Sequence, residues 1–267
     1  MKRILILLIA LITTASFAFS EGAVTTGSIE DRGFVLDNVL HDPERGDIHF
    51  NLYVPDSYDG TQPVPLYIAL PGWEGLYFQG VGADLKWETM PFAARKYAPD
   101  MIIASAQLND WGMTSAQDAI ALTEYLMSAY NVDPSRVYLS GYSGGGETGS
   151  LVMELRPELY AAYLMMASQW DGKLEPLAAA RTPVYMIIGE DDSYYGSESL
   201  KNAYARLHTL YETKGLSDAE IDDILVLNVK DADWFKERGI SDQHGGGMAF
   251  PEEPGLLEWF FSKTKKG

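Results

Sequence analysis

Cysteine is absent from this chain of 267 residues. Without thiols the chain cannot form a disulfide, carry a lipid-modified cysteine or use a cysteine nucleophile, so its apolar core alone must hold the fold. Positive charge is also scarce, because 20 Lys and Arg stand against 38 Asp and Glu, for a net charge of −18. Such a surface repels phosphate backbones and anionic membranes, so we predict no nucleic-acid partner.

Long apolar runs are missing as well. Lys2 and Arg3 precede an apolar run at residues 4–12, which is shorter than the roughly 20 residues of a membrane-spanning helix. Small residues follow, as in a signal peptide. We therefore predict a cleaved signal peptide at residues 1–20 and a secreted or periplasmic protein with no stable membrane anchor after processing. No oligomeric state is predicted.

Residues 46–267 are predicted to form one catalytic domain, preceded by a weakly patterned N-terminal segment at residues 21–45. Short apolar segments alternate with longer amphipathic ones, which predicts the α/β class, with a mostly parallel central sheet and helices on both faces. The predicted strands are 47–54, 64–70, 101–106, 136–139, 161–167, 184–188 and 224–229, and the predicted helices are 115–130, 143–155, 197–214 and 256–264.

Two connections carry further expectations. The first two strands are joined by the turn-rich residues 55–60, which suggests that the sheet opens with an antiparallel pair. Residues 215–223 follow the long helix, with Ser217 as a helix cap, and are expected to form either part of a lid or a surface helix.

A glycine-rich motif, Gly-Tyr-Ser-Gly-Gly at residues 141–145, lies between a predicted strand and a predicted helix. In this setting a G-x-S-x-G motif holds its serine in a sharp turn with the hydroxyl raised above the sheet. The motif therefore predicts Ser143 as a nucleophile. The same stretch also fits G-x-G-x-x-G, but several strands precede it and no acidic residue follows at the spacing that dinucleotide binding requires.

A serine hydroxyl needs a histidine to take its proton, and the chain has four histidines. His41 and His49 precede the centre of the predicted sheet, and His208 lies inside a predicted helix. His244 follows the last strand in a loop with three consecutive glycines. We therefore predict His244 as the general base.

The carboxylate that orients this histidine is expected to lie between the serine and the histidine in the sequence. The strand at 184–188 runs into Gly-Glu-Asp-Asp at residues 189–192. Asp192 is the predicted acid, with Asp191 as the alternative. Two N–H groups must stabilise the oxyanion, and we predict those of Gly144 and Trp73.

Residues 131–145 strongly resemble the segment that leads into the nucleophile of secreted single-domain esterases in the α/β-hydrolase superfamily. These relatives include feruloyl and acetylxylan esterases, polyhydroxybutyrate depolymerases and the catalytic domain of prolyl oligopeptidases. Residues 156–162 and the turn at 189–192 are similar too. The resemblance implies an α/β-hydrolase fold. One departure affects the oxyanion loop, where relatives usually carry His-Gly and this chain has Pro-Gly at residues 71–72.

These features predict a secreted serine hydrolase that cleaves carboxylic esters through an acyl-enzyme and needs no metal or organic cofactor. The expected substrate is a small-molecule or carbohydrate-linked ester. A serine peptidase of the prolyl oligopeptidase type and a noncatalytic binding module are the alternatives. Loops at the carboxyl ends of the strands are rich in aromatic residues, of which Tyr142, Trp170 and Tyr194 are predicted to contact substrate.

Overall fold

The computed structural model describes residues 24–265, so the signal peptide predicted at residues 1–20 lies outside the described residues. The strands are β1 (Val24–Thr25), β2 (Ile29–Asp31), β3 (Phe34–Asp42), β4 (Gly46–Tyr53), β5 (Val64–Leu70), β6 (Ile102–Gln107), β7 (Val132–Tyr142), β8 (Ala162–Met166), β9 (Val184–Gly189) and β10 (Leu225–Lys230). The α-helices are α1 (Ala83–Trp87), α2 (Met90–Tyr97), α3 (Met113–Ala129), α4 (Gly144–Leu155), α5 (Leu174–Ala180), α6 (Glu198–Thr213), α7 (Asp218–Ile224), α8 (Ala232–Glu237) and α9 (Leu256–Ser262). Four short 3-10 helices are η1 (Trp73–Gly75), η2 (Tyr77–Gln79), η3 (Pro157–Leu159) and η4 (Gly245–Glu252).

All the strands belong to one sheet with the order β1-β3-β4-β6-β5-β7-β8-β9-β10, and β2 pairs with β3. Strands β5 to β10 run parallel to their neighbours, whereas β1 to β4 form antiparallel pairs and β4 joins β6 in the antiparallel sense. The predicted mostly parallel α/β sheet is thus confirmed. Because the strands are parallel, the loops that follow β5, β7, β8, β9 and β10 meet at one edge of the sheet.

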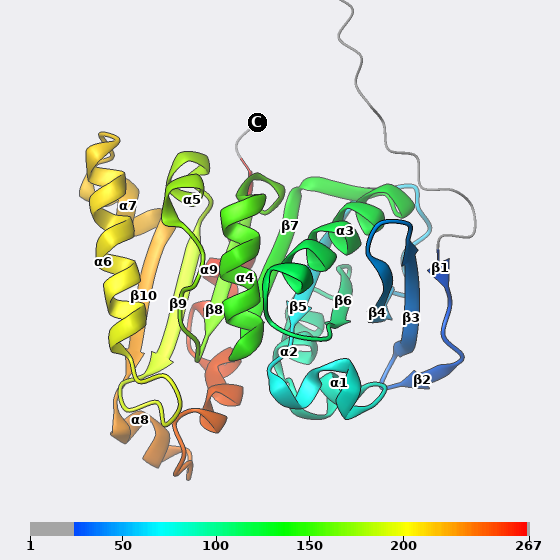
Figure 1. The fold of residues 1–267 in the computed structure, drawn as a ribbon, viewed down its shortest axis with the longest axis horizontal. Helices are drawn as coiled ribbons and strands as arrows, with labels where there is room; N and C mark the ends of the chain where they lie inside the picture. The colour runs from blue at the N-terminus through cyan, green and yellow to red at the C-terminus, as the bar shows by residue number, and fades with distance from the viewer. Residues whose placement is uncertain (1–23, 266–267) are drawn as a thin grey trace, which may run out of the picture.

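Helices cover both faces of the sheet, and each face has its own apolar core. One core contains Leu122 of α3, Val152 of α4 and Leu207 of α6, and the other contains Leu85 of α1 and Phe260 of α9. In Figure 1 the helices α3 to α6 lie in front of the sheet and α9 lies behind it. No helix within residues 24–265 has the length and apolar character of a membrane span.

The predicted pairing of the first two strands is wrong. Strand β4 pairs with β3 and β6, while β5 pairs with β6 and β7. The connection between β4 and β5, residues 54–63, is long enough to pass the width of a skipped strand, since neighbouring strands are only about 4.8 Å apart. A turn-rich composition therefore marked a loop but not a hairpin.

The boundary predicted at residue 45 does not separate two parts of the fold. Strand β3, inside the supposed N-terminal segment, pairs with β4 across that position. A bulge between Val35 and Asn38, with Asp37 at φ 57°, interrupts the register between β3 and β4. The Asn38 side chain is buried in the bulge and donates to the carbonyl oxygens of Val35 and Phe50. A strand with such a bulge and a buried polar residue lacks the regular sequence pattern from which strands are predicted.

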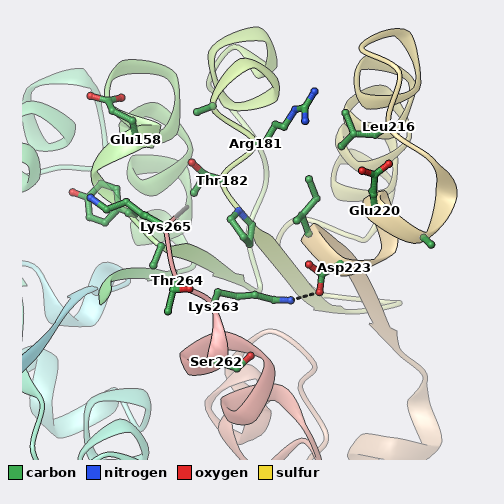
Figure 2. A pocket seen from close by; sticks show the side chains of 16 residues that line it. Glu158, Arg181, Thr182, Leu216, Glu220, Asp223, Ser262, Lys263, Thr264 and Lys265 are labelled. Atoms are coloured by element: carbon green, nitrogen blue, oxygen red, sulfur yellow. Dashed lines mark hydrogen bonds and ion pairs between the residues drawn. The ribbon is translucent and has the colours of Figure 1, made fainter. Parts of the chain in front are cut away.

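Helix α7 is a surface helix rather than part of a lid. It leads into the amino end of β10, whereas the loops that carry the predicted site leave the carboxyl ends of the strands. It borders a cavity of about 840 Å³ that is also lined by Thr182 and by the C-terminal residues 262–265, and Asp223 and Lys263 form an ion pair of 2.7 Å at its edge (Figure 2). The cavity and the predicted site are thus at opposite ends of the strands.

Candidate active site

Ser143 lies in the tight turn between β7 and α4, with φ 52° and ψ −125°. This backbone conformation is strained for any residue with a side chain, and it is the conformation that a nucleophile turn requires. Neighbouring glycines make the turn possible. A Cβ on Gly141 would lie 2.2 Å from the carbonyl oxygen of Gly145, and one on Gly145 would lie 2.2 Å from that of Leu70.

Hydrogen bonds to strand β8 and the loop after it hold the main chain of Ser143. Its N–H donates to the carbonyl oxygen of Met166 over 3.0 Å, and its carbonyl oxygen accepts the Ser168 hydroxyl over 2.6 Å. Because both main-chain groups are used, only the side chain of this residue is left to interact with the other loops. The turn is therefore rigid before any ligand arrives.

The side chains of Ser143, His244 and Asp192 form one line of hydrogen bonds. Ser143 Oγ lies 3.0 Å from His244 Nε2, and His244 Nδ1 lies 2.9 Å from Asp192 Oδ2. Since Nδ1–H donates to the carboxylate, Nε2 is left as the acceptor that faces the serine hydroxyl. The three residues come from the loops after β7, β10 and β9, and their contacts match the geometry in which a histidine removes a proton from a serine.

The carboxylate in this line is that of Asp192, and its side chain is fully buried. Its Oδ1 accepts the main-chain N–H groups of Tyr194 and Tyr195 over 3.0 and 2.9 Å. Asp191, the alternative acid, is exposed, and its own N–H donates to the Gln243 side chain. The turn after β9 thus directs one carboxylate inward and the other to solvent.

The histidine loop is fixed by contacts that the sequence analysis did not foresee. The carboxylate of Asp242 accepts the N–H groups of His244 and Gly245 and the hydroxyl of Ser193. These hydrogen bonds lower the pKa of Asp242, and the one from Ser193 has the largest effect. An acid two residues before the histidine was visible in the sequence, but nothing there indicated its partner in the loop after β9.

Tyr142 was predicted to contact substrate, and the structure corrects this prediction. Its ring is buried, and its hydroxyl donates to the main-chain carbonyl oxygen of His244 over 2.6 Å. A Cβ at Gly72 would lie 3.0 Å from this ring, and one at Gly247 would lie 2.9 Å from it. Tyr142 therefore connects the nucleophile strand to the histidine loop and offers no accessible surface.

Trp170, also predicted to contact substrate, lies at the margin of the core. Its indole N–H donates to the carbonyl oxygen of Gly172, and its ring packs edge-on against Tyr163 with centroids 6.0 Å apart. The ring is half-buried and belongs to the margin of the core on the α4 side. A large aromatic residue in a loop after a strand here serves packing, which is the commoner use of such side chains.

Tyr194 and Tyr195 surround His244 from the loop after β9. The ring of Tyr194, which is 73% exposed, stacks on the imidazole with centroids 5.4 Å apart. Tyr195 meets the imidazole edge-on at 5.5 Å, and its hydroxyl lies near the side chains of Ser143 and Glu147. Burial, together with the charge of Glu147, raises the pKa of this phenol, so it stays protonated. Of the two, only Tyr194 was singled out as a substrate contact.

The two N–H groups predicted to stabilise an oxyanion belong to the loops beside Ser143. Within residues 24–265, no hydrogen bond occupies the N–H of Gly144, the first residue of α4, or that of Trp73. A Cβ on Gly72 would lie 3.2 Å from Ser143 Cβ, so the loop after β5 approaches the nucleophile closely. The neighbouring Gly72 N–H instead donates to Glu88 Oε1 over 3.0 Å. Free N–H groups at a helix start favour negative charge.

A buried polar network supports this loop from behind. Gln107 donates to the carbonyl oxygens of Gly75 and Gly80, and its own oxygen accepts from Gly82 and Asn51. Two buried carboxyls, those of Asp84 and Glu88, lie next to this network, and within residues 24–265 neither forms an ion pair. Burial raises the pKa of Glu88 to about 8 and that of Asp84 to about 6.

The remaining histidines lie away from the line of hydrogen bonds. His41 pairs with Asp47, and His49 pairs with Asp37 and stacks on Tyr77. His208 is on α6, next to Glu212. In the part of the chain that the structure describes, no group of three or more His, Asp and Glu side chains could hold a metal ion.

Comparison with known proteins adds a family match and a set of structural neighbours. Residues 104–209 match the prolyl oligopeptidase family. No curated protein sequence gives a significant match. Among solved structures, a thermostable esterase has a TM-score of 0.69 at 19% identity, over 87% of this chain and 63% of its own.

Two further neighbours differ in size. The S-formylglutathione hydrolase of Staphylococcus aureus has a TM-score of 0.60 at 10% identity, over 88% of this chain and 100% of its own. Oligopeptidase B from Leishmania major has a TM-score of 0.55 at 14% identity, over 86% of this chain and 36% of its own. The chain thus spans less than two thirds of the esterase and about a third of the oligopeptidase. The fold is that of the α/β-hydrolases, and the matches support a serine hydrolase.

The buried carboxyl of Glu88 makes stability depend on pH. In the unfolded chain Glu88 loses its proton near pH 4.5, whereas the folded chain keeps the proton until about pH 8. Unfolding therefore releases a proton between these values, and the free energy of unfolding falls as pH rises through them. At about 1.4 kcal/mol per pKa unit, we expect a loss of a few kcal/mol between pH 5 and pH 9 that Glu88→Gln removes.

Urea unfolding of the wild type and Glu88→Gln at pH 5.5, 7 and 8.5 measures this effect. Glutamine keeps an acceptor oxygen for the Gly72 N–H but cannot ionise. Glu74→Gln, at an exposed acid in the same loop, is the matched control for the loss of one negative charge. If the difference between wild type and Glu88→Gln is the same at all three pH values, Glu88 does not carry the proton in the folded protein.

Proposed function

We propose that this member of the α/β-hydrolase superfamily is a serine hydrolase that cleaves carboxylic esters with Ser143, His244 and Asp192. The observation that carries the proposal is the unbroken line of hydrogen bonds from Ser143 Oγ to the buried carboxylate of Asp192. Two unoccupied N–H groups beside the same serine complete the requirements for acyl transfer.

In the first half of the reaction, His244 Nε2 takes the proton of Ser143 Oγ while this oxygen attacks the ester carbonyl carbon. The carbonyl oxygen becomes an oxyanion that the N–H groups of Gly144 and Trp73 stabilise. The imidazolium, stabilised by Asp192, then gives its proton to the leaving alkoxide. An alcohol departs and the acyl group stays on Ser143.

In the second half, a water molecule takes the place of the alcohol. His244 removes one proton from the water, and the resulting hydroxide attacks the acyl carbon. Collapse of the second tetrahedral intermediate breaks the bond to Ser143 Oγ, which recovers its proton from His244. The products are a carboxylic acid and an unmodified serine. His244 returns every proton that it takes up, so no further proton donor or acceptor is needed.

Tyr195 extends this machinery. It lies beside each of the three residues, since its N–H donates to Asp192, its ring meets that of His244 and its hydroxyl is close to Ser143. The hydroxyl remains a donor throughout the neutral pH range because burial raises its pKa. We infer that Tyr195 restricts the Ser143 hydroxyl to the position from which it attacks.

A second candidate activity, peptide hydrolysis, is favoured by the match to the prolyl oligopeptidase family. A peptidase that binds a free amino terminus needs a carboxylate close to its nucleophile. Glu147 lies one helical turn after Ser143, where its main-chain N–H donates to the Ser143 carbonyl oxygen, but its carboxylate already accepts a hydrogen bond from Gln169 over 3.1 Å. Because this carboxylate is already hydrogen-bonded, it is a poor acceptor for a free amino terminus, which supports an ester as the substrate.

Export of the protein is part of the proposal, because residues 1–20 carry the pattern of a signal peptide. The strongly acidic composition fits a small-molecule or carbohydrate-linked ester better than a polyanionic substrate. The intact mass of the protein recovered from the medium or periplasm of producing cells measures whether the segment is removed.

Replacement of Ser143 is the direct test of the function. We expect the wild type to hydrolyse short 4-nitrophenyl esters and Ser143→Ala to lose about 10⁶-fold in kcat, as for other serine nucleophiles that act with a histidine. Feruloyl esters, acetylated xylan and peptide amides in the same panel separate the candidate substrates. Equal ester turnover by both proteins would refute the mechanism, and turnover of amides but not esters would favour the peptidase.

The two neighbouring acids after β9 provide a matched pair. Asp192→Asn should lower kcat by about 10⁴-fold, because an amide at this position favours the wrong tautomer of His244. Asp191→Asn removes a charge from the adjacent exposed position and should change kcat less than threefold, roughly the scatter of a surface substitution. Steady-state kinetics on one ester compares them, and a larger loss in Asp191→Asn would reverse the assignment.

A further inference from the structure

We propose that three aromatic side chains beside the nucleophile form the acyl-binding subsite and select an uncharged, planar aromatic acyl group. These residues are Trp73, Phe78 and Trp111, here called the aromatic wall. The inference rests on the proposed function for the position of the reacting ester, and it adds the chemical class of the acyl group.

The aromatic wall is a continuous surface made from two loops. The ring of Trp73 lies 4.8 Å from that of Phe78 and 5.4 Å from that of Trp111, both in edge-on geometry. The loops are joined by a hydrogen bond from the N–H of Tyr77 to the carbonyl oxygen of Leu108. The wall is thus assembled before a ligand binds, and its rings present faces and edges that suit another aromatic ring.

Two of these rings are exposed, whereas Trp111 is half-buried and packs against the core. Trp73 is 50% exposed and Phe78 is 56% exposed, so neither fills the core. Other aromatic residues of the same region have structural partners, as Tyr77 stacks on His49 and Trp170 packs on Tyr163. Exposed apolar surface of this kind marks a place where a ligand can cover it.

The aromatic wall touches the nucleophile turn. A Cβ on Gly144 would lie 2.6 Å from the ring of Trp111, so this ring lies directly on the residue that follows Ser143. Trp73 follows Gly72, whose Cβ position is 3.2 Å from Ser143 Cβ. A group bound against the wall is therefore next to the carbon atom that Ser143 attacks.

The position of the histidine decides which part of the ester faces the wall. The leaving alcohol must lie near His244 Nε2, because it takes its proton from that atom. His244 is bordered by Tyr194 and Tyr195, whereas the wall borders Gly144 and the oxyanion loop. With the alcohol on the histidine side, the remaining substituent of the acyl carbon faces the aromatic wall.

Charge limits the acyl group further. The charged residues next to the wall in sequence are acidic, Glu74 after Trp73 and Asp110 before Trp111. Asp110 is held at this position because its carboxylate accepts from Ser115 and Gly112. A carboxylate on the acyl group would be repelled here, so the subsite fits a neutral ring such as a cinnamoyl or benzoyl group.

Binding to an inactive protein tests the subsite without relying on turnover. Titration calorimetry of Ser143→Ala with methyl cinnamate is compared with methyl 3-cyclohexylpropanoate, which has a similar size and no π-system. We expect tighter binding of the cinnamate, and a roughly two- to tenfold smaller preference in Ser143→Ala/Phe78→Ala, the range that one aromatic pair contributes. Ser143→Ala/Tyr97→Ala, at an exposed ring that stacks on Phe261, should keep the preference.

Equal binding of the two esters, or a preference that Phe78→Ala leaves unchanged, would overturn the inference. The inference would also be overturned if the preference were lost in Ser143→Ala/Tyr194→Ala but kept in the Phe78 variant. That result would mean that the aromatic ring of the ester binds on the side of His244.

Turnover with a constant leaving group separates this inference from the proposed function. The ratio of kcat/KM for 4-nitrophenyl cinnamate to that for 4-nitrophenyl 3-cyclohexylpropanoate should fall in Phe78→Ala by the same factor as the binding preference. If neither ester is hydrolysed but methyl cinnamate binds as expected, the esterase proposal fails and the aromatic subsite stands. If both esters are hydrolysed with a ratio that Phe78→Ala does not alter, the subsite fails and the esterase proposal stands.

Discussion

Close packing of main-chain segments at residues 141–145 is the constraint on which the site depends. The turn brings the carbonyl oxygens of Leu70 and Gly145 to within 2.2 Å of positions where a side chain would have a Cβ, so only glycine fits there. This proximity gives Ser143 its positive φ and starts α4 directly behind it. It also brings the loop after β5 against the nucleophile. One steric condition therefore sets the position of Ser143, a free N–H at a helix start and the approach of the loop after β5 together.

Two buried carboxyls near this turn are held in different ways, and the difference fits their positions. Asp192 accepts two main-chain N–H groups and the imidazole of His244, so its charge is surrounded by donors. Glu88 accepts one N–H, from Gly72, and its pKa rises to about 8 because burial is not offset by a cation. A fixed charge at Asp192 stabilises an imidazolium. At Glu88 a mostly protonated carboxyl can hold the oxyanion loop without placing a second negative charge behind it.

The sequence predicted those parts of the protein in which a local pattern and a global rule agree. The alternation of strands and helices predicted the parallel half of the sheet, and the strand-turn-helix setting singled out Ser143. The antiparallel half was harder, since β3 contains a bulge at Asp37 and β4 skips its neighbour in the sequence. Pairing between distant strands depends on contacts between segments that are far apart in the sequence. No window of residues contains that information.

The same limit explains why the sequence could not sort the aromatic residues of the loops. In sequence, Tyr142, Trp170, Tyr194 and Trp73 all follow strands and look alike. Their roles depend on what lies opposite: a carbonyl of the histidine loop for Tyr142, a core tyrosine for Trp170 and the imidazole for Tyr194. Trp73 meets the exposed ring of Phe78 and the half-buried ring of Trp111.

A side chain that supports the fold loses its exposure to a protein partner, whereas one that binds substrate must keep it. The glycines around Ser143 show that this chain packs closely wherever its segments meet. The exposure of Trp73 beside so tightly packed a turn therefore supports a role in ligand binding.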